Sequence, residues 1–501
     1  MSDTLIFDAP SLPENRAATG ITGLDDILGG GFPRNRLYLI QGDPGVGKTT
    51  LGLQFLREGV RGGERVMYVT LSETIEEIEG VAQSHGWSLD GIHLHEHSAG
   101  EQLQTDQHHT IFHASEVDLT ETVSKLMSAV GDVKPSRIVF DSLSELRLLA
   151  GGPLRYRREI LALKHHFAGQ QCTVMLLDDR TSDAGDLQLQ SLCHGVLLLE
   201  QAALTYGSDQ RRLRVTKMRG LNFRSGFHDF AVRTGGLSVY PRLVAAEHRH
   251  TFAPKMDSTG LADLDRLLGG GLDRGASAVF LGPSGTGKST IASRFAVATA
   301  DRGERAAIYS FDESPAMLFA RSRGLGIELQ KHVDNGSIIV QPIDPSELMP
   351  GEFVHLVRNA VENEGARTIV IDSLTGYINA MPEERALMLV LHELLTYLGQ
   401  QGVTSILIMT QHGMMGSGMS TAVDISYLAD TVLLFRYFEH AGEVRQAISV
   451  FKRRGGAHER TIRELALGGS EGVFIGEPLR QFRGVFSGVP VYEREQGQAE
   501  Q

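Results

Sequence analysis

The sequence contains few cysteines and no long apolar run. Cys172 and Cys193 are the only cysteines among 501 residues. Both lie in apolar stretches, which indicates reduced residues of a protein core. No stretch approaches the roughly 18 apolar residues of a transmembrane helix, and the N-terminal residues lack the basic and then apolar layout of a secretory signal. We therefore expect a cytoplasmic protein with no membrane partner.

Positive charge is also scarce. The chain has 48 lysine and arginine residues against 61 aspartate and glutamate residues, for a formal net charge of −13. A surface that neutralises nucleic-acid phosphates needs the opposite balance. The composition therefore argues against nucleic acid as a partner, although it leaves a local basic groove open. A chain of this length holds two or three domains.

A glycine-rich motif is present twice. Both copies fit the pattern G-x-x-x-x-G-K-[ST], in which backbone N–H groups bind phosphate oxygens, the lysine reaches the β- and γ-phosphates and the final hydroxyl binds Mg²⁺. The copies consist of Gly42, Asp43, Pro44, Gly45, Val46, Gly47, Lys48, Thr49 and Thr50, and of Gly282, Pro283, Ser284, Gly285, Thr286, Gly287, Lys288, Ser289 and Thr290. We predict that both bind nucleotide, with Thr49 and Ser289 as Mg²⁺ ligands and with Lys48 and Lys288 in catalytic roles.

The sequence around each motif has the form that a phosphate-binding loop requires. Residues 36–40 and 276–280 are apolar runs typical of strands, and residues 51–56 and 291–295 are typical of helices. A loop between a strand and the N-terminus of a helix is the setting in which this motif binds phosphate.

The two motifs belong to an internal repeat. The segment TGITGLDDILGGG from Thr19 matches TGLADLDRLLGGG from Thr259, 240 residues later, and the glycine-rich motifs have the same spacing. Two copies of one domain therefore account for nearly the whole chain. We expect an N-terminal segment over residues 1–18, a first domain over 19–247, a second domain over 248–485 and a polar C-terminal tail over 486–501.

Within each copy, short β-branched runs alternate with helical segments, which predicts an α/β fold with a parallel sheet flanked by helices. Ligands of such sheets bind beyond the carboxyl ends of the strands. The run RIVFD ends at Asp141 and the run TIVID ends at Asp372. These aspartates are candidate Mg²⁺ ligands opposite the glycine-rich loops, with a helix N-cap as the alternative role.

Acidic residues also follow an earlier strand in each copy, the one that comes after the helix of the glycine-rich motif. Glu73 in TLSET, and Asp312 with Glu313 in SFDES, are candidate catalytic acids, because a carboxylate there could polarise an attacking water. An acid in the first turn of the following helix is the alternative. The copies differ, since Ser72 stands where the second copy has Asp312.

A pair of cations closes each repeat. Lys217 and Arg219 lie in TKMRG, and Lys452 and Arg454 lie in FKRRG. A spacing of two residues puts both cations on one face of a strand. They are far along the chain from their own glycine-rich motif, and a cation that reaches a γ-phosphate commonly comes from a neighbouring subunit. A solvated basic turn is the alternative.

With these motifs the sequence resembles the KaiC family, the double-domain RecA-like ATPases of the bacterial circadian clock. The resemblance covers residues from about 15 to 485. It implies two tandem RecA-like P-loop domains and a double-ring homohexamer with ATP at the subunit interfaces, where the four cations reach into the neighbour's site. It also implies slow ATP hydrolysis in the first ring and serine/threonine autokinase activity in the second, with ATP and Mg²⁺ as cofactors.

The resemblance also implies roles for particular residues. Asp312 and Glu313 act as general base and as its support in phosphoryl transfer to a hydroxyl. The family's first ring has two adjacent glutamates, so Ser72 puts the hydrolysis rate of the first domain in question. The family's Ser-Thr phosphoacceptor pair corresponds to Ser426 and Tyr427, of which Ser426 is the predicted acceptor and an ordinary interface serine is the alternative.

Several functions stay open at this point. The leading one is an ATP-hydrolysing, self-phosphorylating hexamer in clock-like timing or signalling, with a KaiB-like protein as a possible partner on the first ring. A RecA/RadA-type recombination ATPase and an ATP-assembled scaffold with little turnover are the alternatives. The negative net charge, the duplicated domain and the lack of a separate small DNA-binding module favour the first.

Overall fold

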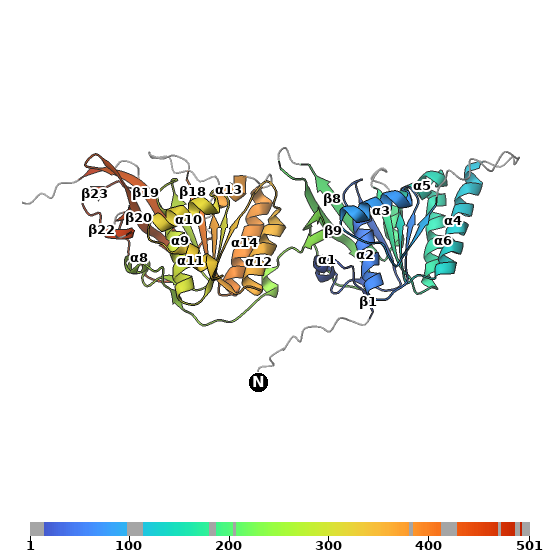
Figure 1. The fold of residues 1–501 in the computed structure, drawn as a ribbon, viewed down its shortest axis with the longest axis horizontal. Helices are drawn as coiled ribbons and strands as arrows, with labels where there is room; N and C mark the ends of the chain where they lie inside the picture. The colour runs from blue at the N-terminus through green and yellow to red at the C-terminus, as the bar shows by residue number, and fades with distance from the viewer. Residues whose placement is uncertain are drawn as a thin grey trace, which may run out of the picture. The chain divides into compact units, whose positions relative to one another are not determined.

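The computed structural model describes residues 15–97, 114–179, 187–203, 207–379, 384–411, 428–468, 472–485 and 491–492. The chain divides into two compact units, residues 1–242 and residues 243–501, and each is described by itself (Figure 1). No helix among the described residues combines the length and the apolar character needed to cross a bilayer.

The first unit alternates strands and helices along most of its length. Its elements are β1 (Arg16–Ala17), α1 (Thr22–Ile27), β2 (Phe32–Pro33), β3 (Leu37–Gly42), α2 (Lys48–Arg61), β4 (Val66–Thr70), α3 (Ile75–Ser84), β5 (Ile92–Glu96), α4 (Ala114–Val133), β6 (Arg137–Asp141), α5 (Leu143–Ala150), α6 (Pro153–Ala168), β7 (Thr173–Asp179), α7 (Leu187–Leu192), β8 (Gly195–Ala202), β9 (Gln210–Met218), β10 (His228–Arg233) and β11 (Gly236–Tyr240).

The main sheet of this unit is parallel in its middle and antiparallel at one end. Over the described residues its strand order is β11-β10-β9-β8-β3-β7-β6-β4-β5. The pairs from β8 to β5 are parallel, and those from β8 to β11 are antiparallel. The predicted α/β fold with a parallel sheet and flanking helices is confirmed.

The second unit repeats this plan. Its elements are η2 (Ala245–Glu247), β12 (Met256–Asp257), α8 (Ala262–Leu268), β13 (Leu272–Asp273), β14 (Ser277–Gly282), α9 (Lys288–Asp301), β15 (Arg305–Ser310), α10 (Pro315–Gly324), α11 (Leu329–Asp334), β16 (Ile338–Pro342), α12 (Pro350–Glu362), β17 (Ala366–Asp372), α13 (Leu374–Asn379), α14 (Glu384–Gln400), β18 (Thr404–Thr410), β19 (Thr431–His440), β20 (Glu443–Arg453), β21 (Arg463–Leu467), β22 (Val473–Pro478), β23 (Phe482–Arg483) and β24 (Val491–Tyr492). Its main sheet has the order β16-β15-β17-β18-β14-β19-β20-β21-β22 in the described part, which matches the first sheet strand for strand.

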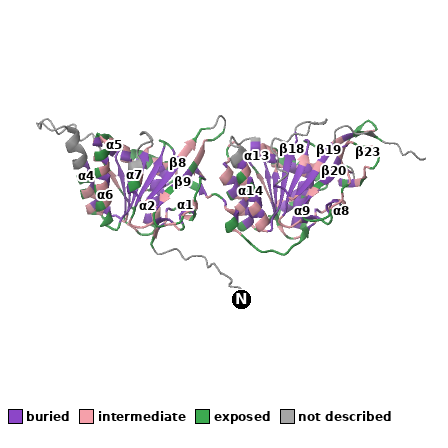
Figure 2. Cartoon of the chain, turned by 180° about the vertical axis from the view of Figure 1, so that it is seen from behind, coloured by how far each residue is buried: buried purple, intermediate pink, exposed green. Residues whose placement is uncertain are grey.

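The central strands are buried on both faces, as the purple strands in Figure 2 show. In β3, Tyr38 and Ile40 pack in one apolar cluster with Phe55 of α2. Leu37 and Leu39 of the same strand pack in a second cluster on the opposite face, with residues of α6. Alternate side chains of a strand point to opposite faces, so a strand covered by helices on both sides is apolar at consecutive positions. This explains the near-continuous apolar runs from which the strands were predicted.

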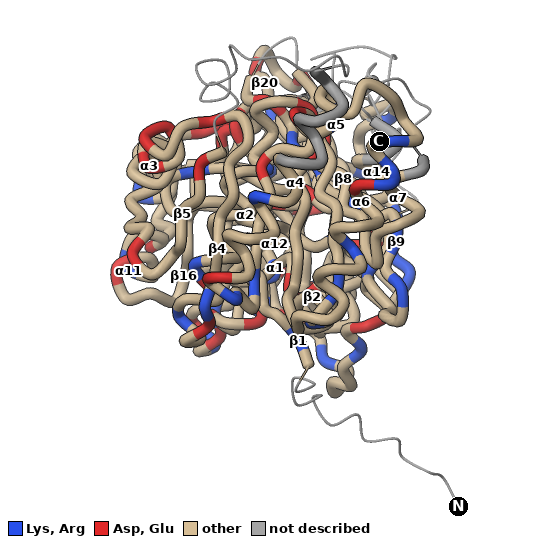
Figure 3. Tube along the Cα trace, turned by 90° about the vertical axis from the view of Figure 1, so that its right-hand side faces the viewer, with Lys and Arg blue, Asp and Glu red and all other residues tan. Residues whose placement is uncertain are grey.

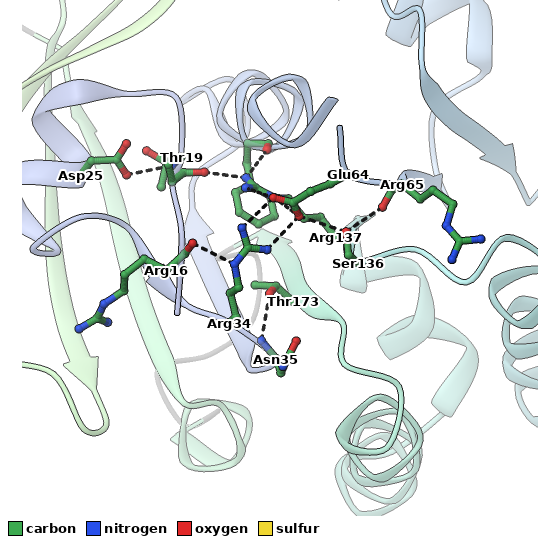
Figure 4. A network of polar contacts seen from close by, with 12 residues as sticks. Arg16, Thr19, Asp25, Arg34, Asn35, Glu64, Arg65, Ser136, Arg137 and Thr173 are labelled. Atoms are coloured by element: carbon green, nitrogen blue, oxygen red, sulfur yellow. Dashed lines mark hydrogen bonds and ion pairs between the residues drawn. The ribbon is translucent and has the colours of Figure 1, made fainter. Parts of the chain in front are cut away.

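A buried ion network ties the P-loop helix to the sheet of the first unit (Figure 4). The Arg137 side chain at the start of β6 is only 3% exposed and pairs with Glu64 at 2.7 Å. Arg137 also donates to the carbonyls of Ala18 and of Phe55 in α2. Arg34 makes a second pair with Glu64 at 2.8 Å. Burial would raise the pKa of Glu64, but hydrogen bonds from Arg137 and Arg34 lower it to about 2.

We expect Glu64→Gln to destabilise the first unit by about 3 kcal/mol, because the buried Arg137 guanidinium then lacks its counter-charge. The folded-state pKa of Glu64 is depressed, so its contribution is fully present above a pH of about 4.5 and is lost as the pH falls toward 2. Denaturant unfolding followed by fluorescence of Trp87, the single tryptophan of the chain, measures the change. Glu58→Gln, which removes an exposed pair with Arg61, serves as the control and should change stability by less than about 1 kcal/mol. An equal effect of both variants would contradict the expectation.

Candidate functional site

Both glycine-rich motifs form the loop that their patterns predict. The first loop leaves the end of β3 and enters α2 at Lys48, and the second leaves the end of β14 and enters α9 at Lys288. Gly47 has a φ of 109° and Gly287 a φ of 96°, in a region that side-chain-bearing residues rarely adopt. Each loop therefore turns directly into a helix N-terminus, where unpaired N–H groups bind anions.

The two loop lysines are buried against their own loops. Lys48 Nζ donates to the carbonyls of Gly42 and Asp43, both at 2.9 Å. Lys288 Nζ donates to those of Gly282 at 2.8 Å and Pro283 at 2.6 Å. Burial lowers the pKa of Lys288 to about 8, although Asp372 opposes this shift. Both ammonium groups are thus held at the carboxyl end of the P-loop strand.

The predicted Mg²⁺ ligands of the first unit lie in contact. Thr49 Oγ1 donates to Asp141 Oδ2 at 2.6 Å, although β7 separates β3 from β6 in the sheet. Tyr68 of β4 donates to the same oxygen at 2.5 Å. Burial raises the pKa of Asp141, while the bonds from Thr49 and Tyr68 oppose the rise.

The second unit repeats the hydroxyl and carboxylate pair without the tyrosine. Ser289 hydrogen-bonds Asp372, and burial again raises the pKa of that aspartate. In the repeat, Ile308 takes the place of Tyr68. Tyr68 was not predicted, because its position inside a strand looks like any other core residue.

The strand-end glutamates lie at the same edge of each sheet. Glu73 Oε2 is buried and has no hydrogen-bond partner among the described residues. Burial raises the pKa of Glu73, and the negative charges of Asp141, Glu77 and Asp179 raise it further. Acidic residues continue into the first turn of α3, which appears red in Figure 3.

In the second unit the corresponding glutamate has an ion-pair partner. Glu313 Oε2 lies 3.0 Å from Arg321 of α10. Burial raises the pKa of Glu313, while Arg321 opposes the rise. The matching position in α3 is Val81. Glu73 therefore has no arginine partner at this position, whereas Glu313 forms an ion pair there. Arg321 was not predicted, since an arginine on a helix surface carries no motif.

The second candidate acid is placed differently in the two units. In the second unit, Ser373 donates a hydrogen bond to Asp312. In the first unit Ser72 replaces this aspartate, and Ser142, the counterpart of Ser373, donates instead toward Asp179 at 3.5 Å. Asp179 Oδ1 also lies 2.7 Å from Lys48 Nζ. The run CTVMLLDD ends at Asp179, so the strand-end argument applied to this run would have found it.

The predicted cations of the first unit lie away from the carboxyl end of β3. Val196 of β8 pairs with Leu39 of β3 on one side and with Lys217 of β9 on the other. Lys217 is therefore level with Leu39, which lies three residues before β3 ends at Gly42. Lys217 Nζ donates to the Gln190 carbonyl at 2.6 Å. The Arg219 side chain points the same way and donates to the carbonyl of the next residue, Ser191.

The second unit has the same arrangement. Val432 pairs with both Val279 and Lys452, so Lys452 again lies level with the middle of the P-loop strand. Lys452 Nζ donates to the Ala429 carbonyl at 2.9 Å, and Arg454 pairs with Asp430 at 3.4 Å. Ser426 and Tyr427, the predicted phosphoacceptor and its neighbour, lie outside the described residues.

The residues at the sheet edge of the first unit fit a nucleotide with its metal ion. The orphaned Oε2 of Glu73 needs a polar partner, because a buried polar atom without one is costly. A Cβ added at Gly45 would meet nothing within 4 Å, so the outer face of the first loop is open. Hydroxyl and carboxylate oxygens, as in the Thr49 and Asp141 pair, are the ligands that Mg²⁺ prefers.

Comparison with known proteins agrees with this geometry. The family model described as "ATPase: KaiC" matches residues 17–244 and 258–480. Fold and site thus define a P-loop ATPase with two tandem RecA-like domains. The chain belongs to the KaiC family, and the predicted resemblance is confirmed.

Relatives match along nearly the whole chain. The circadian clock protein KaiC3 of Synechocystis sp. is 25% identical over 480 residues, which cover 95% of this chain and 94% of the relative. The circadian clock oscillator protein KaiC of Thermostichus vulcanus is 26% identical, with 94% and 91% covered. The protein of that name from Prochlorococcus marinus is 27% identical, with 98% and 96% covered. The relatives therefore share both domains and their order.

We expect Tyr68→Phe to raise the Mg²⁺ concentration needed for half-maximal nucleotide binding by the first domain about tenfold, because Asp141 loses the hydroxyl that orients it. Titration with Mg²⁺ at fixed ATP, followed by Trp87 fluorescence, measures the shift. Tyr309→Phe is the matched control, since this buried hydroxyl donates to the Leu356 carbonyl. An unchanged Mg²⁺ dependence in Tyr68→Phe would remove Tyr68 from the site.

Proposed function

We propose that the protein binds Mg²⁺-ATP in both domains, hydrolyses it in the first and transfers its terminal phosphoryl group to one of its own hydroxyls in the second. One observation carries the proposal. In each domain a P-loop lysine, a hydroxyl paired with an aspartate, and a strand-end glutamate lie at the same edge of the sheet. Membership of the KaiC ATPase family supports ATP hydrolysis. The transfer of a phosphoryl group to one of the protein's own hydroxyls is a further step of the proposal.

Each group has a role that follows from its position. The loop N–H groups with Lys48 or Lys288 hold the phosphates, and the aspartates with Thr49 or Ser289 hold the metal ion. When bound, Mg²⁺ neutralises charge on the phosphate oxygens.

The strand-end glutamates act next to these groups. Glu73, whose raised pKa suits a proton acceptor, orients a water for attack. In the second domain Glu313 takes the proton of an attacking hydroxyl, with Asp312 as its neighbouring support.

We further propose that nucleotide lies between subunits of a homohexamer. The register that keeps Lys217 and Lys452 away from the carboxyl end of their own P-loop strand supports a role in a neighbour's site. Lys217, Arg219, Lys452 and Arg454 would then add positive charge to the terminal phosphoryl group of the next subunit.

A role in timing or related signalling completes the proposal, together with a KaiB-like partner on the first ring. It rests on the relatives, whose names describe circadian clock proteins. A cytoplasmic location is part of the same proposal.

We expect Lys48→Ala to reduce hexamer assembly in the presence of Mg²⁺-ATP, because a nucleotide held between subunits contributes contacts to both. Sizing by light scattering measures the hexamer fraction. Lys331→Ala, which removes an exposed lysine paired with Glu328, should assemble like the unaltered protein. An unchanged hexamer fraction in Lys48→Ala would count against interfacial nucleotide.

The kinase step is tested with γ-labelled ATP and peptide mapping. We expect label on the peptide that contains Ser426, and its loss in Ser426→Ala with ATP hydrolysis retained. Glu313→Gln should also remove the label, since the acceptor hydroxyl then lacks its base. Label that persists at the same peptide in Ser426→Ala would exclude this acceptor, and hydrolysis without any label would favour an ATPase that is not a kinase.

A further inference from the structure

The two P-loop lysines of the chain have different surroundings. Lys48 Nζ has a third partner besides its two loop carbonyls, the carboxylate of Asp179 at 2.7 Å. Among the described residues, no carboxylate lies within ion-pair distance of Lys288. The register explains the difference, because Gly42 pairs with Asp179 whereas Gly282 pairs with Thr410. The surroundings of the two lysines thus differ by one residue at the end of equivalent strands.

Asp179 is held at this position by its own contacts. Ser144 of α5 donates to Asp179 Oδ2 at 3.1 Å, and Ser142 approaches the same oxygen at 3.5 Å. The side chain is 24% exposed, against 6% for Lys48. In the sheet, β7 lies between the P-loop strand β3 and β6. The carboxyl end of β7, which carries Asp179, therefore lies between the carboxyl ends of those two strands. Asp179 is therefore held beside the lysine and stays partly exposed.

A bound nucleotide needs the same lysine. The P-loop lysine reaches the β- and γ-phosphates, and its ammonium group has three donors. In the first domain the two loop carbonyls and Asp179 together match these donors, so a phosphate oxygen has to replace the carboxylate. The displaced carboxylate then lies near a group of the same charge, which disfavours the bound state further.

We propose that Asp179 competes with the nucleotide phosphates for Lys48, so that the first domain binds ATP more weakly than it would with the uncharged residue that the second domain carries. The inference rests on the proposed ATP binding by both domains. It assigns Asp179 as the residue that sets the nucleotide affinity of the first domain.

The chain contains a reporter that is connected to the first site. Trp87 is its single tryptophan, and its ring lies 4.7 Å from that of His85. His85 Nε2 lies 3.3 Å from the hydroxyl oxygen of Thr50 in the first P-loop. We therefore expect nucleotide at this loop to change the surroundings of the indole. A signal that persists in Lys288→Ala and is lost in Lys48→Ala identifies it as first-site binding.

The test is a titration of the full-length protein with Mg²⁺-ATP, followed by Trp87 fluorescence. We expect Asp179→Asn to lower the dissociation constant about tenfold, as the loss of a charge-assisted competitor implies. Asp90→Asn, which removes an exposed loop carboxylate before β5, makes the same change in net charge and should leave the constant unchanged. An equal or higher dissociation constant in Asp179→Asn overturns the proposal.

The reverse substitution provides a second test, which holds even if Asp179→Asn does not fold. In a Lys48→Ala background, calorimetry with Mg²⁺-ATP reports the second site. We expect Thr410→Asp to weaken binding there about tenfold, and unchanged binding overturns the proposal. If the unaltered protein gives neither a fluorescence change nor binding heat, the proposed ATP binding itself fails, which is distinct from failure of the role of Asp179.

Discussion

The structure depends on the convergence of parallel strands at one edge of each sheet. Strands β3, β4, β6 and β7 run in the same direction, so the residues that end them meet although the chain separates them by up to about 140 positions. Because the strands are buried on both faces, their polar side chains gather toward the strand ends. The lysine, the hydroxyl and the carboxylates at the carboxyl edge therefore contact one another.

The duplicated domain shows how much chemistry can change on one scaffold. Both sheets have the same strand order, and in both P-loops the lysine donates to two carbonyls of its own loop. The differences are single side chains, and two of them lie at strand ends. Ser72 corresponds to Asp312 in the repeat, and Asp179 corresponds to Thr410. The hydroxyl of Ser142 donates toward Asp179, whereas that of its counterpart Ser373 donates to Asp312. The two sites thus keep their geometry while their electrostatics differ.

The fold was predictable because it depends on periodic features. Apolar runs at consecutive positions marked the buried strands, and the glycine-rich motifs marked the turn from strand to helix. The pairing of Thr49 with Asp141 also followed, since the motif places Thr49, and the end of an apolar run places Asp141, at the carboxyl edge of one parallel sheet. Tyr68 and Arg321 were not predictable in this way, because a tyrosine within a strand and an arginine on a helix have many other roles.

The sequence by itself determined the two-domain α/β architecture, the P-loops and the strand-end carboxylates, because all of these come from local patterns that repeat in the chain. Only the tertiary structure decided which acid lies on which cation. The contact of Asp179 with Lys48 depends on the lateral order of the strands, in which β7 is inserted between β3 and β6. That order arises from packing between segments far apart in the chain, and no local pattern encodes it.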